Sequence, residues 1–156
     1  MKYIFFLLLA SLFIAGCHSN RVYEDYKEFD TKAWLVNDPA VFEFEISDTT
    51  KKYNLYYNVR NTLQYPFARI FVNYTLTDST GIQLSKQLLS NYLFDQKTGQ
   101  PLGRSGLGDV YDNQFLILEN QYFRKSGAYT LQLEQFNRLD TLAGILAVGF
   151  RIETVQ

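Results

Sequence analysis

Apolar and polar residues alternate along most of the chain after residue 40. In Val41–Ser47, Phe42, Phe44 and Ile46 alternate with Glu43 and Glu45. A period of two over a whole segment is typical of a strand that buries one face. The same alternation recurs, between turn signals, in Tyr53–Arg60, Arg69–Thr77, Ile82–Leu89, Phe115–Tyr122, Ala128–Phe136 and Gly144–Glu153. The pattern predicts an all-β fold, an antiparallel β-sandwich with jelly-roll-like closure.

The alternation also predicts which side chains face the core. One set belongs to the second and third segments: Tyr53, Leu55, Tyr57, Val59, Ile70, Val72, Tyr74 and Leu76. In Ile82–Leu89 we expect Ile82, Leu84 and Leu88 to point inward, with Lys86 interrupting that face.

Two segments do not show this pattern. Residues 18–30 are polar and acidic, and Tyr23, Tyr26 and Phe29 recur in them at a spacing of three. That spacing fits either a helical turn or an extended arm laid on the domain. Arg138–Ala143 is short and polar, and we expect it to be turn-like or briefly helical.

The first seventeen residues have a different character. Lys2 precedes an apolar run that ends on Ile14-Ala15-Gly16-Cys17, and Cys17 is the only cysteine. The run of about 13 residues is short of the ~20 that a spanning helix needs. The alternative, a membrane-anchoring helix with an incidental cysteine, is therefore less favoured. The stretch resembles a lipoprotein signal peptide with its lipobox.

These features predict the organisation of the whole chain. We expect a signal peptide over residues 1–16, lipidation at Cys17, a lipidated tether over residues 17–33 and one β-sandwich domain over residues 34–156. Position two of the mature chain is His18 rather than Asp, which by the common bacterial sorting rule favours the outer membrane. No acidic run follows Cys17 directly, so we expect the domain to face the periplasm.

Composition excludes several classes of function. The chain has 15 Lys and Arg against 16 Asp and Glu, interspersed without a basic stripe, which argues against a nucleic-acid partner. The only histidine, His18, adjoins the predicted anchor, so it cannot organise a nucleophile inside the domain. With no other His or Cys, a conventional zinc or copper site is excluded. We therefore predict no enzyme, no metal and no cofactor.

Three weaker hypotheses rest on the remaining polar and aromatic residues. Glu43 and Glu45 could form a carboxylate pair for an envelope-polymer hydrolase, although a solvated strand face explains them more simply. Asp109 and Asp112, with Asn113, could supply oxygens to calcium, although Asp and Asn commonly cap turns. Tyr56 and Phe71, expected on outward faces, could stack on a sugar, although such aromatics are commonly cross-strand pairs.

The segment 95–113 is the longest irregular stretch, with four glycines and one proline. A connection of this length in a small domain is usually functional or disordered. We predict that part of it forms a contact surface, consisting of Gly106, Gly108, Asp109, Tyr111 and Asp112. The alternative is that Asp109 and Asp112 cap turns and hold the loop on the sandwich.

Several motifs resemble one known family, the gliding-motility lipoprotein GldH. They are Val22-Tyr23, Trp34 with Asn37-Asp38, Phe42-Glu43-Phe44, the run from Tyr53 to Asn61, Tyr65-Pro66-Phe67, the run from Gly106 to Asp112, and Gly144-Ile145 with the run from Val148 to Glu153. The resemblance covers essentially the whole mature chain.

The resemblance implies a lipoprotein of surface gliding in bacteria that move without flagella, in a group of proteins linked to type IX secretion. The family brings no catalytic residues, so the expectation is a non-enzymatic component that contacts other envelope proteins and holds the membrane through lipid on Cys17. The alternative is a carbohydrate-binding lipoprotein of the cell envelope.

Overall fold

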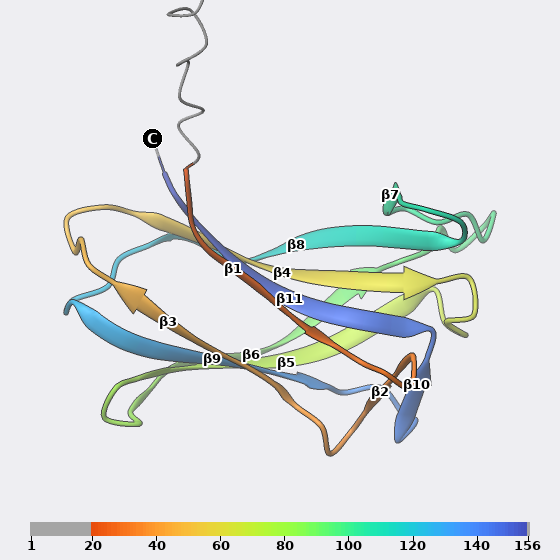
Figure 1. Cartoon of the computed structure of the whole chain (residues 1–156), viewed down its shortest axis with the longest axis horizontal. Helices are drawn as coiled ribbons and strands as arrows, with labels where there is room; N and C mark the ends of the chain where they lie inside the picture. The colour runs from red at the N-terminus through yellow and green to blue at the C-terminus, as the bar shows by residue number, and fades with distance from the viewer. Residues whose placement is uncertain (1–19, 156) are drawn as a thin grey trace, which may run out of the picture.

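The computed structural model describes residues 20–155 and is built from two antiparallel sheets that pack face to face (Figure 1). One sheet has the order β1 (Arg21–Glu28), β11 (Ile145–Thr154), β4 (Tyr53–Thr62), β8 (Val110–Gln121) and β7 (Arg104–Ser105). The other has the order β3 (Ala40–Ile46), β9 (Gly127–Gln135), β5 (Arg69–Asp78) and β6 (Gln83–Tyr92). A small third sheet pairs β10 (Thr141–Ala143) with β2 (Ala33–Leu35) at one end.

The strand order is that of a jelly roll. Without the short strands β2, β7 and β10, the chain places β1, β4, β8 and β11 in one sheet and β3, β5, β6 and β9 in the other. In each sheet the first strand lies beside the last, as β1 beside β11 and β3 beside β9. This interleaving of two Greek keys defines the jelly roll. The predicted fold class is confirmed.

The core forms where the inner faces of the two sheets meet. The inward residues predicted for β3, β4 and β5 are all buried. Phe44 of β3 reaches across to Phe150 of β11, with ring centroids 5.2 Å apart, and also stacks on Tyr129 of β9. Aromatic pairs at this spacing add to the area they bury. The described part of the chain contains no helix with the length and hydropathy of a membrane span.

The prediction for β6 was wrong in its choice of face. Ile82, Leu84 and Leu88 are 61%, 48% and 45% exposed. The inner face of β6 carries Ser85 and Asn91 instead. Ser85 Oγ lies 2.7 Å from the Tyr74 hydroxyl, and Asn91 Oδ1 accepts a hydrogen bond of 2.6 Å from the Tyr57 hydroxyl. Leu89 lies on the same face and packs against the core. Ser85 and Asn91 supply the partners that the buried tyrosine hydroxyls need.

The N-terminal segment is extended, which settles the choice left open for residues 18–30 in its described part. β1 pairs with β11 along its length, and Tyr23 packs on the rings of Phe44 and Phe150. The predicted tether over residues 17–33 is therefore too long, because residues 21–28 are a strand of the sheet. The signal peptide and Cys17 lie outside the described residues.

Two further boundaries differ from expectation. Within Arg138–Ala143, Thr141–Ala143 forms strand β10 rather than a helix, and it pairs with β2. β8 begins at Val110 rather than Phe115, and it pairs at its start with β7. The irregular stretch after β6 is therefore shorter than the segment 95–113.

Candidate functional site

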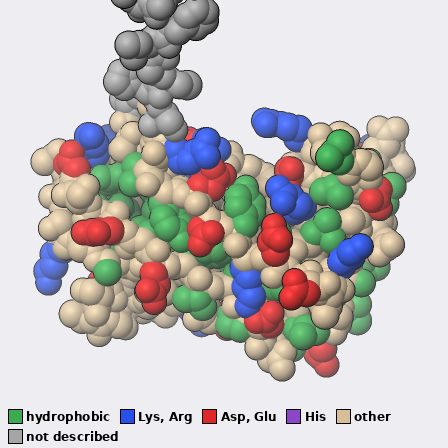
Figure 2. Space-filling view, in the orientation of Figure 1, with side chains coloured by type: hydrophobic (Ala, Val, Ile, Leu, Met, Phe, Trp, Pro, Cys, Tyr) green, Lys and Arg blue, Asp and Glu red, His purple; other side chains and the backbone are tan. Residues whose placement is uncertain are grey.

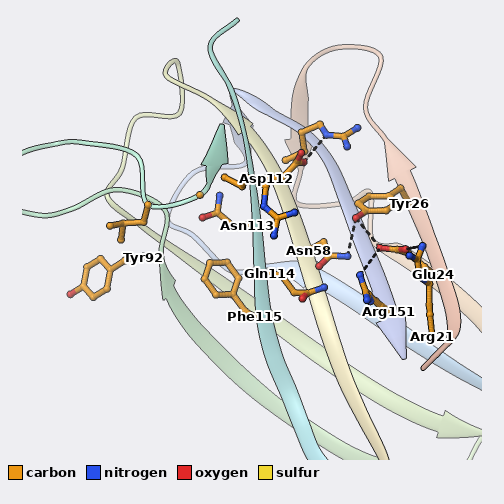
Figure 3. A pocket seen from close by; sticks show the side chains of 14 residues that line it. Arg21, Glu24, Tyr26, Asn58, Tyr92, Asp112, Asn113, Gln114, Phe115 and Arg151 are labelled. Carbon is orange, nitrogen blue, oxygen red and sulfur yellow. Dashed lines mark hydrogen bonds and ion pairs between the residues drawn. The ribbon is translucent and has the colours of Figure 1, made fainter. Parts of the chain in front are cut away.

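The outer face of the five-stranded sheet carries a groove with a volume of about 620 Å³ (Figure 3). It forms where β1, β11, β4 and β8 present outward side chains in rows: Tyr26 is opposite Gly149, Gly149 opposite Asn58, and Asn58 opposite Gln114. Outward residues of neighbouring strands lie side by side, so positions far apart in sequence meet here.

Tyr26 lies over Gly149, which has no side chain to hold it off the sheet. A Cβ at Gly149 would come within 2.6 Å of two Tyr26 ring carbons. The Tyr26 hydroxyl accepts a hydrogen bond of 3.0 Å from Asn58 Nδ2 and donates one of 3.3 Å to Glu24 Oε1. Burial and the Glu24 carboxylate raise the pKa of Tyr26. The phenol is therefore neutral at physiological pH and both donates and accepts hydrogen bonds.

Two buried polar atoms beside the groove have no hydrogen-bond partner in the described part of the chain. Asn58 is 5% exposed, and its Oδ1 has no hydrogen-bond partner among residues 20–155. The same holds for Nε of Arg151. Both side chains line the groove, so one buried acceptor and one buried donor among its lining residues lack a partner within residues 20–155.

The groove has more positive than negative charge. Four arginines and two acids line it: Arg21, Arg60, Arg104, Arg151, Glu24 and Asp112. Charged side chains of both signs are otherwise interspersed on the side seen in Figure 2. A cationic excess of this kind, made of arginines, suits ligands with carboxylate or phosphate groups.

The arginines differ in their partners. Arg60 Nε donates a hydrogen bond of 2.8 Å to Asp112 Oδ1, and its guanidinium lies 5.6 Å from the Tyr26 ring centroid. Arg21 pairs with Glu24, and Arg151 pairs with Glu153 and, at 3.8 Å, with Glu24. Arg104 forms no ion pair with a carboxylate of the described residues, so its charge is the one most available to a partner.

A short hairpin borders the groove at the β8 edge. Arg104 and Ser105 of β7 pair with Asp112 and Tyr111 of β8, and Gly106 N donates a 2.8 Å hydrogen bond to Val110 O. The tip residue Leu107 is 94% exposed. We call residues 104–112 the β7–β8 hairpin.

The structure places all five predicted contact residues in this hairpin. Gly106, Gly108 and Asp109 belong to its turn, where Gly108 has a φ of +69° that favours glycine. Only Asp112 lines the groove. Tyr111 is on the opposite face of β8, because neighbouring residues of a strand point to opposite sides.

The calcium hypothesis finds no support in the arrangement of these side chains. Asp112 points outward to Arg60, whereas Asn113 is buried and donates a hydrogen bond of 2.9 Å to Asn61 Oδ1. Their oxygens therefore do not converge. Among residues 20–155, no cluster of three His, Cys, Asp or Glu side chains could hold a metal ion.

Aspartates outside the hairpin cap turns of the domain. Asp48, Asp78 and Asp95 accept hydrogen bonds from backbone N–H groups two or three residues further on. Hydrogen bonds from Thr50, Thr80 and Thr98 lower the pKa of these three carboxyls. This is the local pattern expected of Asp in turns.

The two remaining hypotheses were a carboxylate pair at Glu43 and Glu45 and a stacking surface of Tyr56 and Phe71. Glu43 and Glu45 are exposed on β3, and the β9 residues opposite them, Thr130 and Ala128, add no acid. Tyr56 and Phe71 lie on the outer faces of opposite sheets, so they cannot form one stacking surface. The proposed sugar platform made of these two rings was wrong.

A second cavity, of about 590 Å³, lies on the outer face of the four-stranded sheet. Its apolar lining includes Phe67, Phe71, Leu88 and Phe136, and Phe136 is 60% exposed. Arg69 adds its guanidinium over the rings of Phe71 and Tyr92.

Sequence reasoning missed most of the groove. It singled out Asp112, but not Tyr26, Asn58, Arg60 or Arg151. The alternation in Tyr53–Arg60 does predict that Asn58 and Arg60 face away from the core. Nothing in the sequence shows that Arg151 and Tyr26 lie in the same rows, because that depends on the order of the strands.

The fold and the groove define the class: a small jelly-roll protein with an arginine-rich polar groove on one outer sheet face. Residues 21–152 match the model of the GldH lipoprotein family. The chain is 30% identical over 154 residues to the gliding motility lipoprotein GldH of Flavobacterium johnsoniae, covering 94% of this chain and 93% of that protein. It is 30% identical over 157 residues to the gliding motility lipoprotein GldH homolog of Christiangramia forsetii, covering 96% and 94%.

The chain therefore belongs to the GldH lipoprotein family, and the resemblance found in the sequence is confirmed. Membership implies lipid anchoring in the cell envelope and a role in gliding motility. Among solved structures, the mosquito-larvicidal Cry4Aa toxin from Bacillus thuringiensis superposes with a TM-score of 0.41 at 12% identity, over 78% of this chain and 19% of that chain.

Proposed function

We propose that this lipoprotein is acylated at Cys17 and acts, without catalysis, as a component of the gliding machinery and the associated type IX secretion through contacts with other envelope proteins. The observation that carries the proposal is family membership over residues 21–152. The arrangement of the groove supports a binding role, because its polar groups are spread over four strands and its acids are paired with arginines.

The proposed contact surface is the β7–β8 hairpin together with the groove beside it. It includes the predicted residues Gly106, Gly108, Asp109, Tyr111 and Asp112. Leu107 at the tip supports this choice, because an almost fully exposed leucine on a short turn has no role in the core of its own domain. Arg104 adds a cation to the same hairpin, so the surface fits a partner with an apolar pocket and acidic groups.

The test compares two double variants that make matching changes of side chain on different parts of the surface. Leu107→Asp with Arg104→Glu should abolish gliding and the recovery of partner proteins from the native envelope, while the melting temperature stays within about 2 °C of the unchanged protein, as expected for exposed positions. Leu84→Asp with Lys86→Glu, on the outer face of β6, is the matched control and should glide normally. Normal gliding by the hairpin variant would refute the proposed surface.

For localisation, we propose the outer membrane with the domain in the periplasm. The support is His18 at the second mature position and the absence of an acidic run directly after Cys17. Protease treatment of intact cells should leave the domain uncut, and treatment of cells with permeabilised outer membranes should remove it. Cleavage in intact cells would place the domain on the cell surface.

The groove also supports a second candidate, the binding of an acidic carbohydrate. Arginines beside the neutral phenol of Tyr26 and the amides of Asn58 and Gln114 are the groups that recognise sugar carboxylates and hydroxyls together. Titration with uronic-acid oligosaccharides tests this function. Binding that is lost in Arg60→Ala and kept in Leu107→Asp would favour it over the hairpin contact.

A further inference from the structure

The start of the described chain lies beside two loops of the sandwich. Asn20 O accepts a hydrogen bond of 2.8 Å from Thr154 N, and the next residue, Val155, donates one of 2.9 Å to Lys52 O. Lys52 in turn lies over the ring of Tyr122, 5.6 Å from its centroid. Asn20 is therefore about two strand spacings, ~10 Å, from the loop that carries Lys52.

This end of the molecule is where three connections meet: the β3–β4 loop (residues 47–52), the β5–β6 loop (residues 79–82) and the β8–β9 loop (residues 122–126). The strand registers place them together, because Tyr53 pairs with Gln121, Gly127 with Ile46, and Asp78 with Tyr129. Figure 1 shows the three loops at one end and β2 with β10 at the other. We call these three connections the anchored-end loops.

The anchored-end loops are basic. They contain four cations, Lys51, Lys52, Arg124 and Lys125, and one anion, Asp48. The loops at the opposite end contain three cations and five anions: Lys32, Lys97, Arg138, Asp30, Asp38, Asp95, Asp109 and Asp140. The domain therefore has its positive end at the point where the chain leaves toward Cys17.

Half of this positive charge is without an acidic partner. Lys51 lies 3.5 Å from Asp48, and Lys125 is near enough to Asp78, at the end of β5, to add to the hydrogen bonds that lower the pKa of that carboxyl. Lys52 and Arg124 form no ion pair with a carboxylate in the described part of the chain. Two apolar side chains project at the same end, since Tyr122 is 52% and Ile82 is 61% exposed. Lysine and arginine with an exposed tyrosine and an aliphatic residue are the side chains that favour a lipid–water interface.

We propose that the anchored-end loops dock on the anionic lipid headgroups of the membrane that holds the N-terminal lipid. The proposal rests on the acylation of Cys17 proposed above. Cys17 precedes Asn20 by three residues, which span at most ~11 Å when fully extended. An acyl chain in the bilayer thus keeps the loops within reach of the headgroups, where cations are attracted over about one Debye length, ~8 Å.

Docking orients the domain as well as strengthening its attachment. The hairpin tip at Leu107 belongs to the opposite end of β8 from the β8–β9 loop, so it points away from the docked surface. Strands of ten residues, such as β4, are about 33 Å long. The proposed protein-contact surface is thereby held away from the headgroups.

The experiment uses the acylated protein in vesicles and measures the rate at which an amine reagent modifies each lysine, by mass spectrometry. In vesicles of phosphatidylcholine with phosphatidylglycerol, Lys51, Lys52 and Lys125 should react roughly fivefold more slowly than in pure phosphatidylcholine vesicles. Lys32, Lys86 and Lys97 serve as internal controls and should react equally in both. High salt should remove the difference, because it screens exposed charges.

Two outcomes separate this inference from the anchoring on which it rests. Protein that does not float with vesicles of either composition would show that the lipid anchor is absent. If the protein floats but each of the six lysines reacts with the reagent at the same rate in the two lipids, the docking proposal is overturned. Equal protection of the anchored-end lysines and the control lysines would also overturn it, because the domain would then lie flat on the membrane.

A pair of variants tests the same point by charge reversal. Lys52→Glu with Arg124→Glu should restore fast modification of Lys51 and Lys125 in the anionic vesicles. Lys97→Glu with Arg138→Glu makes the same change of charge at the opposite end and should leave their protection intact. Loss of protection in both variants would overturn docking by the anchored-end loops.

Discussion

Gly144, between β10 and β11, offers a sharp test of how the end of the sandwich is held together. Its N–H donates a 2.9 Å hydrogen bond to Lys32 O, and its carbonyl accepts a 2.8 Å hydrogen bond from Thr62 N. Its φ is +79°, and a Cβ there would lie 2.4 Å from Tyr65 N and 2.9 Å from Gln64 C. These neighbours are backbone atoms, so Gly144→Ala must displace the chain at residues 64 and 65.

Two costs follow from this geometry. The left-handed conformation costs alanine about 1–2 kcal/mol, offset by about 0.4–1 kcal/mol from the stiffer unfolded chain. The steric overlap adds about 1–3 kcal/mol, as overpacking does elsewhere. Displacement also disturbs the buried Tyr65, whose hydroxyl donates to Arg69 O and accepts from Asn137 Nδ2. We expect Gly144→Ala to lower the free energy of unfolding by about 3 kcal/mol.

Gly81 provides a matched control, because its φ is +81° and a Cβ added to it would meet no atom of the described residues within 4 Å. Gly81→Ala therefore has the conformational cost of a positive φ without the steric overlap. It should lower the free energy of unfolding by about 1 kcal/mol. The assay is urea unfolding followed by the fluorescence of Trp34, the only tryptophan, which is fully buried beside β10. Equal losses in the two variants would refute the argument that backbone contact, rather than φ, makes Gly144 essential.

Three other predictions use different parts of the molecule. Cys17→Ser should move the protein from the membrane to the soluble fraction, and unchanged fractionation would place the anchor elsewhere. Tyr26→Phe should lower the free energy of unfolding by about 1–2 kcal/mol, because Asn58 Nδ2, buried beneath Tyr26 on the outer face of the sheet, loses its acceptor. Tyr56→Phe is the control: the Tyr56 hydroxyl accepts only a 3.4 Å contact, so the change should be less than about 0.5 kcal/mol. Burial raises the pKa of Tyr57 and of Tyr65 well above 10, so the stability they supply is complete below the unfolded value near 10 and falls as the pH rises above it. The free energy of unfolding, measured by urea titration at each pH, should therefore decline above pH ~10 by about 1.4 kcal/mol per pH unit for each tyrosine. Tyr57→Phe should flatten that decline, and an unchanged slope would contradict the argument.

The sandwich could be predicted from sequence wherever a strand buries one face and wets the other. β3 shows this most simply, with Phe42, Phe44 and Ile46 buried and the two glutamates between them exposed. The same reasoning did not identify β1 as a strand, because aromatic side chains pack on both of its faces. Tyr23 packs inward on Phe150 and Tyr26 packs outward on Gly149, so the spacing of three between them hides the period of two.

The groove could not be predicted because it depends on strand order rather than on local pattern. Tyr26, Asn58 and Gln114 become neighbours only when β1, β11, β4 and β8 lie in that order. The β7–β8 hairpin could be singled out in advance because its signal is local, a glycine-rich turn with acids beside it. The local sequence pattern therefore predicted the hairpin that borders the groove, whereas the other lining residues come together only through the strand order.

The jelly-roll topology gives a physical reason for separating attachment from recognition. The eight long strands run from one end of the sandwich to the other, so each connection between them belongs to one of two ends. The chain enters beside the basic β3–β4 and β8–β9 loops, while the acidic loops and the exposed Leu107 belong to the other end. A membrane with anionic lipids attracts the first end and repels the second. The lipid and the loop charges therefore act in the same direction, and together they would present the β7–β8 hairpin to partners on the side away from the membrane.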